Sequence, residues 1–309
     1  MLKEHATLSS EKVSVESHRL PEAPLSSQLV RVTAAFARSA IPVSDMTNHY
    51  TLAQDEQSVM RLRAMADSAI GFERPAWRDA GVGPGSRVLE VGCGPGALLG
   101  ELAMLVGASG EAVGIDTSAE AISEARSYLR RRGLSQVRVK VADGFDSGLE
   151  PESFDSAYLR LVLVHVGERA TELLRAVREL VRPGGTIVLS DGDHTSTGIS
   201  GDVPEFEELM NAWKAMMSHR GNDLRIGLHL PRIAADAGLQ VVSFRGHMNI
   251  IEPDVPFRMP HWEARKAIVT DETATAADLC RWEPLVEHYA ASRPFYTCFP
   301  SYTVIARRL

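Results

Sequence analysis

The chain has 309 residues, enough for one enlarged α/β domain or two small ones. Its net charge of −7, without a long Lys/Arg block, argues against broad binding to nucleic acid or to an anionic membrane, because both need a concentrated positive field. The three cysteines form no CxxC pair, which argues against a disulfide framework or a structural zinc site, and no apolar run reaches the ~18 residues that span a bilayer. We expect a cytoplasmic protein that does not act on membranes.

The N-terminal part of the chain divides into an extension and a helix. Residues 1–45 contain many serines and three prolines, which predicts an extension. That extension is either disordered or ordered against the body or against a second copy in a homodimer. From Thr51 to Ala80, apolar residues recur at the three- to five-residue spacing typical of a helix.

Residues 87–195 alternate between strands and helices. The apolar runs predict strands at 87–91, 112–115, 137–141, 156–161 and 186–190. The segments between them predict helices at 95–106, 119–132 and 168–181, the last one broken by Pro183-Gly184-Gly185. Strands separated by helices of this length imply a parallel sheet that is covered on both faces.

The rhythm changes after residue 195. The pattern predicts helices at 204–218 and 229–238, a mainly helical region at 254–290, and strands at 240–244 and 296–305. We therefore predict a doubly wound α/β fold with a mostly parallel, seven-stranded sheet, helical cap insertions and an N-terminal helical lid. In this interpretation residues 46–195 form a ligand-binding core with its lid, and residues 196–309 form the cap and the last strands.

The most informative segment is the strand-to-helix turn Val88-Leu89-Glu90-Val91-Gly92-Cys93-Gly94-Pro95-Gly96. Glycines permit a tight turn and the close approach of a ligand. In open α/β sheets, ligands bind beyond the carboxyl end of the first strand. A plain tight connection is the alternative reading of this turn.

Two acidic residues follow the next strands. Asp116 ends the second predicted strand, where a carboxylate accepts both ribose hydroxyls of a nucleoside; capping of the next helix by Asp116, Thr117 or Ser118 is the alternative. Asp143 follows the third strand and is able to accept an adenine amino group, with Phe145 packing on the ring. An ordinary Asp-Gly turn is the alternative there.

These motifs together resemble the class I, Rossmann-like S-adenosylmethionine-dependent methyltransferases. The resemblance rests on Glu90-x-Gly92-Cys93-Gly94-x-Gly96, on Asp116, on Asp143-Gly144 and on Arg182-Pro183-Gly184-Gly185, and it covers about residues 50–195. The third glycine comes one residue earlier than in the dinucleotide motif GxGxxG, which favours S-adenosylmethionine over a dinucleotide. The similarity is closest to the ubiquinone/menaquinone-type and natural-product enzymes.

The resemblance implies which residues bind the donor, with S-adenosylhomocysteine as the product. The implied donor-binding residues are Tyr50, Glu90, Gly92, Cys93, Gly94, Asp116, Thr117, Asp143, Gly144, Phe145 and Arg160. Tyr50 is expected to close over the donor and the acceptor as a lid, with a packing role as the alternative. Cys93 is not expected to act as a nucleophile, because no histidine neighbour is evident in the sequence.

The acceptor is expected beyond the fourth and fifth strands. His165 is a candidate base, although Val164 stands where many relatives carry glutamate, which puts in doubt any mechanism needing that carboxylate. Asp191-Gly192-Asp193-His194 places two carboxylates and an imidazole at a strand end, suited to acid–base work, with a polar capping loop as the alternative. We predict His165, Asp193 and His194 as catalytic residues, and Tyr50, Asp191 and Trp213 as acceptor-binding residues. For His165 the alternative is a histidine at a helix start that bonds to nearby backbone. Trp213 shares a predicted helix face with Met210 and Met217, which suggests an apolar cap over the acceptor, and a plain core position is the alternative.

The predicted function is methyl transfer to an O, N or C atom of a small, partly hydrophobic molecule in secondary metabolism. The alternatives are C-methylation of an isoprenoid diphosphate with Mg²⁺, and a regulatory protein that binds the donor without turnover. Outside the first alternative no metal site is expected. No Asn-Pro-Pro-Tyr-type motif follows the fourth strand, which argues against a protein or RNA substrate.

Overall fold

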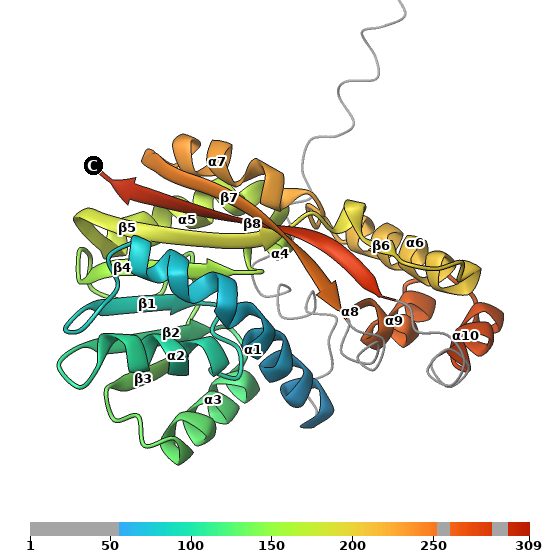
Figure 1. Ribbon diagram of the computed structural model, residues 1–309, viewed down its shortest axis with the longest axis horizontal. Coiled ribbons are helices and arrows are strands. Elements are labelled where there is room, and N and C mark those ends of the chain that lie inside the picture. The colour runs from blue at the N-terminus through green and yellow to red at the C-terminus, as the bar shows by residue number, and fades with distance from the viewer. Residues whose placement is uncertain (1–55, 252–259, 286–295) are drawn as a thin grey trace, which may run out of the picture. The chain divides into compact units, whose positions relative to one another are not determined.

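The computed structural model describes residues 56–251, 260–285 and 296–309 (Figure 1). The N-terminal extension, Tyr50 and parts of the predicted helical region 254–290 lie outside these residues. The strands are β1 Arg87–Val91, β2 Glu111–Asp116, β3 Val137–Val141, β4 Phe154–Arg160, β5 Val181–Gly192, β6 Gly198–Ile199, β7 Leu239–Ile251 and β8 Thr297–Arg308. The α-helices are α1 Glu56–Asp79, α2 Ala97–Val106, α3 Ala119–Arg131, α4 Leu163–Val166, α5 Ala170–Leu180, α6 Pro204–His219, α7 Ile226–Asp236, α8 Pro260–Glu263, α9 Arg265–Thr270 and α10 Ala276–Trp282, and two 3-10 turns are η2 Gly167–Arg169 and η3 His194–Ser196.

The strands form one sheet in the order β3-β2-β1-β4-β5-β8-β6. β7 also pairs with β8, along nearly the whole of that strand. The pairs from β3 to β5 are parallel, whereas β8 runs antiparallel to β5, β6 and β7. The prediction of a doubly wound, mostly parallel α/β sheet is confirmed, and the two-residue β6 adds an eighth strand to the seven expected. The carboxyl ends of the five parallel strands therefore meet at one edge.

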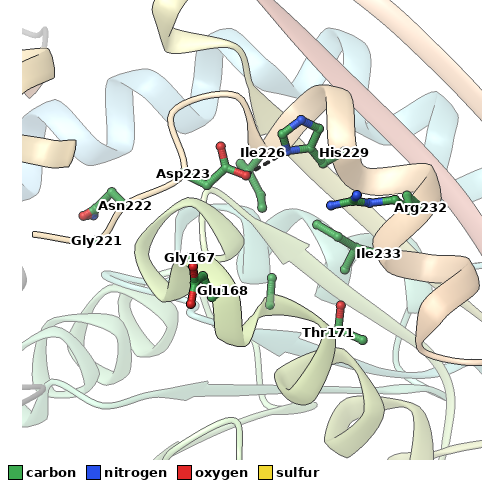
Figure 2. A pocket seen from close by; sticks show the side chains of 11 residues that line it. Gly167, Glu168, Thr171, Gly221, Asn222, Asp223, Ile226, His229, Arg232 and Ile233 are labelled. Atoms are coloured by element: carbon green, nitrogen blue, oxygen red, sulfur yellow. Dashed lines mark hydrogen bonds and ion pairs between the residues drawn. The ribbon is translucent and has the colours of Figure 1, made fainter. Parts of the chain in front are cut away.

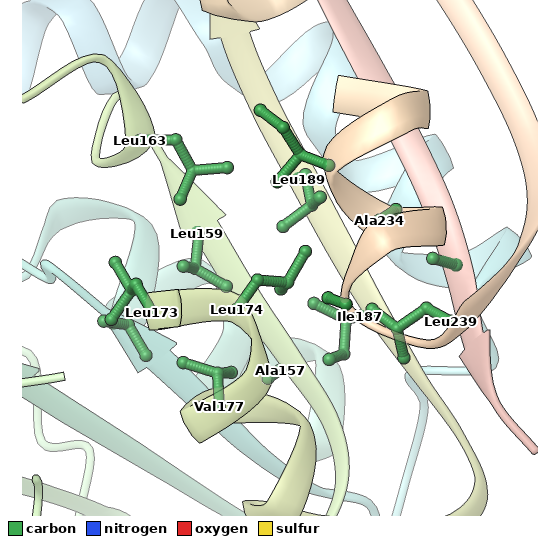
Figure 3. Close-up of a cluster of buried hydrophobic side chains, with 14 of the residues drawn as sticks. Ala157, Leu159, Leu163, Leu173, Leu174, Val177, Ile187, Leu189, Ala234 and Leu239 are labelled. Atoms are coloured by element: carbon green, nitrogen blue, oxygen red, sulfur yellow. The ribbon is translucent and has the colours of Figure 1, made fainter. Parts of the chain in front are cut away.

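Each face of the sheet packs against its own helices. Alternate residues of β4 show the division, since Tyr158 lies in the cluster with α1, α2 and α3 and Leu159 in the cluster with α5 and α7. Figure 3 shows Leu173, Leu174 and other apolar side chains of the second cluster against the sheet. Each such fully buried side chain stabilises the fold by about 1.5–3 kcal/mol.

A separate helical cluster forms from α6, α8, α9 and α10. Its buried side chains include Phe206, Met210 and Trp213 of α6, Trp262 of α8 and Trp282 of α10. Met210 and Trp213 recur at helical spacing on one face of α6, as the sequence predicted. No helix in the part of the chain that the structure describes is both long and apolar enough to cross a membrane.

Two segments differ from the predictions at residue level. The Pro183-Gly184-Gly185 break lies inside β5, because Val181 already pairs with Phe154 and the register shifts before Thr186 meets Ser156. The predicted helix 168–181 is divided into η2 and α5, preceded by the short α4. Gly167, with φ +52°, ends α4 and turns the chain.

The last two strands are also longer than predicted. β7 continues to Ile251 rather than to residue 244, because it pairs with β8 along almost its whole length. Outer-strand residues such as Phe244 and Met248 are exposed, so the apolar pattern alone placed the end of this strand too early.

Candidate active site

Polar residues lie at or just beyond the carboxyl ends of β1 to β5, at one edge of the sheet. In the order of their strands they are Glu90, Asp116, Asp143, Arg160 and Asp191. Their convergence follows from the topology alone, because every one of these strands ends at the same edge.

The glycine turn after β1 forms an open cradle at this edge. Gly92 has φ +71°, and a Cβ there would lie 2.5 Å from Cγ2 of Val162, so the turn has no room for a side chain. Gly94 has φ +49°, but a Cβ there would meet no atom of the described residues within 4 Å. The backbone of Gly94 therefore borders open space, as a ligand cradle requires.

Glu90 lies beside this turn and is only 3% exposed. Within the described part of the chain, its Oε2 has no hydrogen-bond partner. Burial raises the pKa of Glu90 well above its ordinary value; Arg160 opposes this rise, while Asp116 and Glu73 add to it. A buried carboxyl oxygen without a partner costs free energy, and a hydrogen-bond donor of a bound ligand would remove that cost.

Asp116 holds the glycine turn from the neighbouring strand. Its Oδ2 accepts a hydrogen bond from the Gly94 N–H at 2.9 Å, and its Oδ1 accepts one from the Ser118 N–H at 2.9 Å. Burial raises the pKa of Asp116, and these backbone donors oppose the rise. Ser118 caps α3 by accepting from the Ala121 N–H at 3.0 Å, so the capping alternative belongs to Ser118, while Thr117 is exposed.

The segment after β3 forms a tight turn. Asp143 Oδ1 accepts a hydrogen bond from the Phe145 N–H at 2.9 Å, the arrangement expected of an Asp-Gly turn. A Cβ on Gly144 would lie 2.8 Å from Cδ1 of Leu173, so this position packs against the core. The Arg169 guanidinium carbon lies 3.9 Å from the centroid of the Phe145 ring. The ring is thus a platform for a planar group.

Cys93 is buried and its thiol lies among carboxylates. Burial raises the pKa of Cys93 well above its ordinary value, and Glu90 and Asp116 add to this rise. The side chain therefore remains a thiol at neutral pH, which argues against a nucleophilic role.

Arg160, at the end of β4, points to a residue that sequence reasoning missed. Its Nε lies 3.4 Å from Oε1 of Glu73, which comes from α1 and also accepts a hydrogen bond from the Ser190 hydroxyl at 2.6 Å. Leu161 follows with φ +54°, a left-handed conformation that costs a bulky residue about 1–2 kcal/mol. The Leu161 N–H donates to the Ser190 carbonyl at 2.9 Å, which holds this strained end in place.

The two aspartates after β5 are engaged with nearby groups. Asp191 is 2% exposed, and its two oxygens accept from the Gly192 N–H at 2.9 Å and from the Val164 N–H at 3.2 Å. Asp193 accepts from the N–H and the hydroxyl of Thr195 and from the Ser196 hydroxyl, and these bonds lower its pKa. Asp193 therefore caps η3, the alternative considered from the sequence, and its low pKa disfavours a role as a base.

A cluster of histidine and aromatic rings lies beyond β5. The His194 ring meets Trp213 edge-on at 5.7 Å between centroids and lies nearly parallel to Phe299 at 5.8 Å. His261 meets Phe206 at 5.2 Å and Trp213 at 6.0 Å. We name these five rings the histidine–aromatic cluster. The apolar pattern of the segments that contain His261 and Phe299 does not predict that their rings lie in one cluster.

The histidines near this edge are neutral at pH 7. Burial lowers the pKa of His165 to about 4. It lowers that of His194 to about 4, with a further contribution from His165, and that of His261 to about 3, with a contribution from His194. His261 is 4% exposed, and its Nε2 has no hydrogen-bond partner among the residues that the structure describes. The cluster therefore presents uncharged hydrogen-bonding nitrogens between apolar rings.

A surface cavity of about 490 Å³ lies elsewhere, between η2, α5 and α7. Figure 2 shows the bonded pair Asp223 and His229 on one side of it, with Glu168 and Thr171 on the other. His229 Nδ1 lies 2.8 Å from Asp223 Oδ2. None of the predicted site residues lines this cavity. Within the described ranges, no group of three or more His, Cys, Asp or Glu side chains is placed to hold a metal ion.

Comparison with known proteins identifies the family. A family model described as a methyltransferase domain matches residues 83–238, just over half of the chain. An uncharacterized 37.1 kDa protein in transposon TN4556 of Streptomyces fradiae is 35% identical over 187 residues, 60% of this chain and 53% of that protein. Nocamycin O-methyltransferase of Saccharothrix syringae is 30% identical over 154 residues, 50% of this chain and 48% of that protein.

The chain thus spans about half the length of these two curated relatives. Among solved structures, BH2331 of Bacillus halodurans C-125, a provisionally assigned methyltransferase, has a TM-score of 0.54 and 15% identity. This similarity covers 77% of this chain and 99% of that chain, and it shows a shared fold. The family match and the fold confirm the class I resemblance: the chain belongs to the methyltransferase-domain family.

Proposed function

We propose that the protein transfers the methyl group of S-adenosylmethionine to an O, N or C atom of a small, partly apolar organic acceptor. The observation that carries this proposal is the pairing of an open glycine cradle at Gly94 with the buried, unpartnered Oε2 of Glu90. A ligand that brings a hydrogen-bond donor or a cation to this carboxylate removes the cost of leaving it unpaired.

The residues present fit the donor. Glu90 and the backbone of Gly92 and Gly94 would hold its methionine part, and Asp116, the acidic end of β2, would accept from the ribose hydroxyls. Asp116 keeps its two backbone bonds while offering further lone pairs, because an ionised carboxylate has about four acceptor sites. Phe145, in the turn after β3, would pack on the adenine.

The acceptor would lie at the histidine–aromatic cluster beyond β5. When bound, S-adenosylmethionine supplies an electrophilic methyl group on a sulfonium, so positioning of the acceptor provides much of the rate enhancement. Trp213 and Phe299 offer apolar ring surface, and neutral His194 and His261 are able to accept a hydrogen bond from an acceptor hydroxyl or amine. His165 and His194 are uncharged and so able to accept a proton from an acceptor that must lose it, but burial lowers their pKa to about 4, which makes them weak bases. An acceptor that needs little help with its proton therefore suits this site best.

An oxygen acceptor in secondary metabolism is the preferred form of this proposal. It is supported by the similarity to nocamycin O-methyltransferase and by the uncharged character of the cluster, which suits a neutral, partly apolar molecule. A diphosphate acceptor would need several cations at this place; among the described residues, Lys214 is a cation whose charge acts on His194 and His261.

The test is methyl transfer from S-adenosylmethionine labelled in its methyl carbon to a panel of small phenols, enols and carboxylic acids. We expect the label in a small-molecule product, with one S-adenosylhomocysteine formed for each methyl transferred. The variant His194→Phe, which keeps a ring in contact with Trp213, should bind the donor normally and lose acceptor turnover. Tight donor binding without transfer to any acceptor, including a complete small-molecule extract, would support a regulatory role instead.

A further inference from the structure

Glu73 is a buried carboxylate that lies outside the glycine-turn motif. It comes from α1 and is 2% exposed. Among the residues that the structure describes, no group meets its Oε2 in hydrogen-bonding geometry, while the buried Tyr158 hydroxyl interacts with the Glu73 carboxyl group. Its Oε1 accepts from the Ser190 hydroxyl at 2.6 Å and lies 3.4 Å from the Arg160 Nε. A carboxylate buried in this way costs free energy unless a positive charge balances it. Arg160, which pairs with Glu73, also acts on Glu90.

Among the described residues, the charges that act on Glu90 beside Glu73 do not balance. Glu73, Glu90 and Asp116 are three carboxyl groups that interact with one another through Glu90, and Arg160 is the cation that acts on this set. Burial raises the pKa of Glu90, and the neighbouring acids add to this rise. A further negative charge is therefore unfavourable at this edge of the sheet. A cationic ligand at this edge would relieve that repulsion.

The proposed reaction changes the charge of the ligand at this place. In the transfer a lone pair of the acceptor O, N or C atom forms a bond to the methyl carbon while the bond between that carbon and the sulfonium sulfur breaks, and the bonding electron pair stays on sulfur. A proton carried by the acceptor atom leaves to a base or to water. The donor thereby loses its sulfonium charge and becomes the neutral thioether S-adenosylhomocysteine. A site with an excess of buried carboxylates stabilises the cation more than the thioether, because Coulomb interactions are strong where water is excluded.

We propose that Glu73 is a positioning residue that holds Arg160 and supplies the buried negative charge by which the site prefers the sulfonium donor to the thioether product. This inference rests on the proposed function, since it concerns the same donor site. It assigns to α1 a role in release of the product: the charge that favours donor binding no longer acts once the methyl group has left. Ser190 fixes the carboxylate of Glu73 for this purpose.

The test compares binding of donor and product by calorimetry in the full chain. The variant Glu73→Gln keeps the shape and the Ser190 bond but removes the charge, so the Kd of S-adenosylmethionine should rise about tenfold while that of S-adenosylhomocysteine changes less than about twofold. Glu101→Gln is the matched control, because Glu101 is a buried carboxylate of α2 that pairs with Arg74 and Arg132 and is not among the charges that act on Glu90. It should leave the ratio of the two Kd values unchanged.

A second measurement uses the wild-type chain and is independent of whether Glu73→Gln folds. Sinefungin, in which a carbon that bears a protonated amine replaces the methylated sulfur, should bind more tightly than S-adenosylhomocysteine. The inference is overturned if Glu73→Gln shifts both Kd values equally, or if the wild-type protein prefers the thioether to both cationic ligands. Failure of the wild-type protein to bind any of the three ligands would instead overturn the proposed function.

Discussion

Replacing Asp191 by asparagine should flatten the dependence of stability on pH. Burial raises the pKa of Asp191 to about 7, against the opposing effect of the Gly192 and Val164 N–H groups and of Arg160, whereas its ordinary value is 3.8. Between these values the folded chain holds a proton that the unfolded chain has released. Stability therefore falls as pH rises through this window, by about 1.4 kcal/mol per pH unit, and the loss ends above pH 7.

The assay is urea unfolding of wild type and Asp191→Asn at pH 5 and at pH 8. The loss of unfolding free energy between the two pH values should be smaller in the variant by about 3 kcal/mol. The cost of disturbing the hydrogen bonds of Asp191 is present at both pH values, so it cancels from this difference.

The matched control is Asp155→Asn. The Arg87 N–H and Arg182 lower the pKa of Asp155, although burial opposes them, so this carboxylate is ionised in both states from pH 5 to pH 8. The control variant should keep the wild-type pH dependence. If Asp191→Asn showed the same pH dependence as wild type, the assignment of Asp191 as a buried group that is protonated at mildly acidic pH would be refuted.

Three further outcomes follow from the glycines and cysteines. Gly94→Ala should cost about 1 kcal/mol of stability from its positive φ but raise the Kd of the donor at least tenfold, because its Cβ enters the cradle; unchanged affinity by calorimetry would count against the cradle. Gly167→Ala should lower the unfolding free energy by about 2–4 kcal/mol, since its Cβ would lie 2.1 Å from the Gly221 carbonyl oxygen; a variant with wild-type stability in urea would contradict the geometry. A thiol reagent followed by mass spectrometry should modify exposed Cys280 before buried Cys93, and prompt labelling of Cys93 in the native chain would contradict its assignment as a protonated thiol.

The donor side of the site follows closely from the sequence. Alternating strands and helices predict a parallel sheet, and such a sheet brings the ends of β1 and β2 to one edge, so Glu90, Gly94 and Asp116 are predictable as neighbours. The spacing of the glycines also predicts the tight turn with its positive φ angles. Local signals are sufficient there because each residue follows directly from a strand end.

The rest depends on contacts between distant segments. Helical periodicity predicts α1 but does not reveal that Glu73 is buried. Its hydrogen-bond partner Ser190 is 117 residues away in the sequence. His261 lies in a region with no clear apolar pattern, and only the folded chain brings it to Trp213. Asp193 lies in a segment whose acidic and imidazole side chains are typical of a catalytic loop. In the structure the neighbouring Thr195 and Ser196 hydroxyls donate to its carboxylate, which caps η3.

The most direct test of the account is a crystal structure of the protein with S-adenosylhomocysteine. We expect the ribose hydroxyls to bind Asp116 and the amino-acid part to lie against Glu90 and the Gly92–Gly94 turn. The sulfur should be directed toward the histidine–aromatic cluster. Binding of the ligand in the cavity between α5 and α7, or at any place that leaves Glu90 and Asp116 without contact, would contradict it.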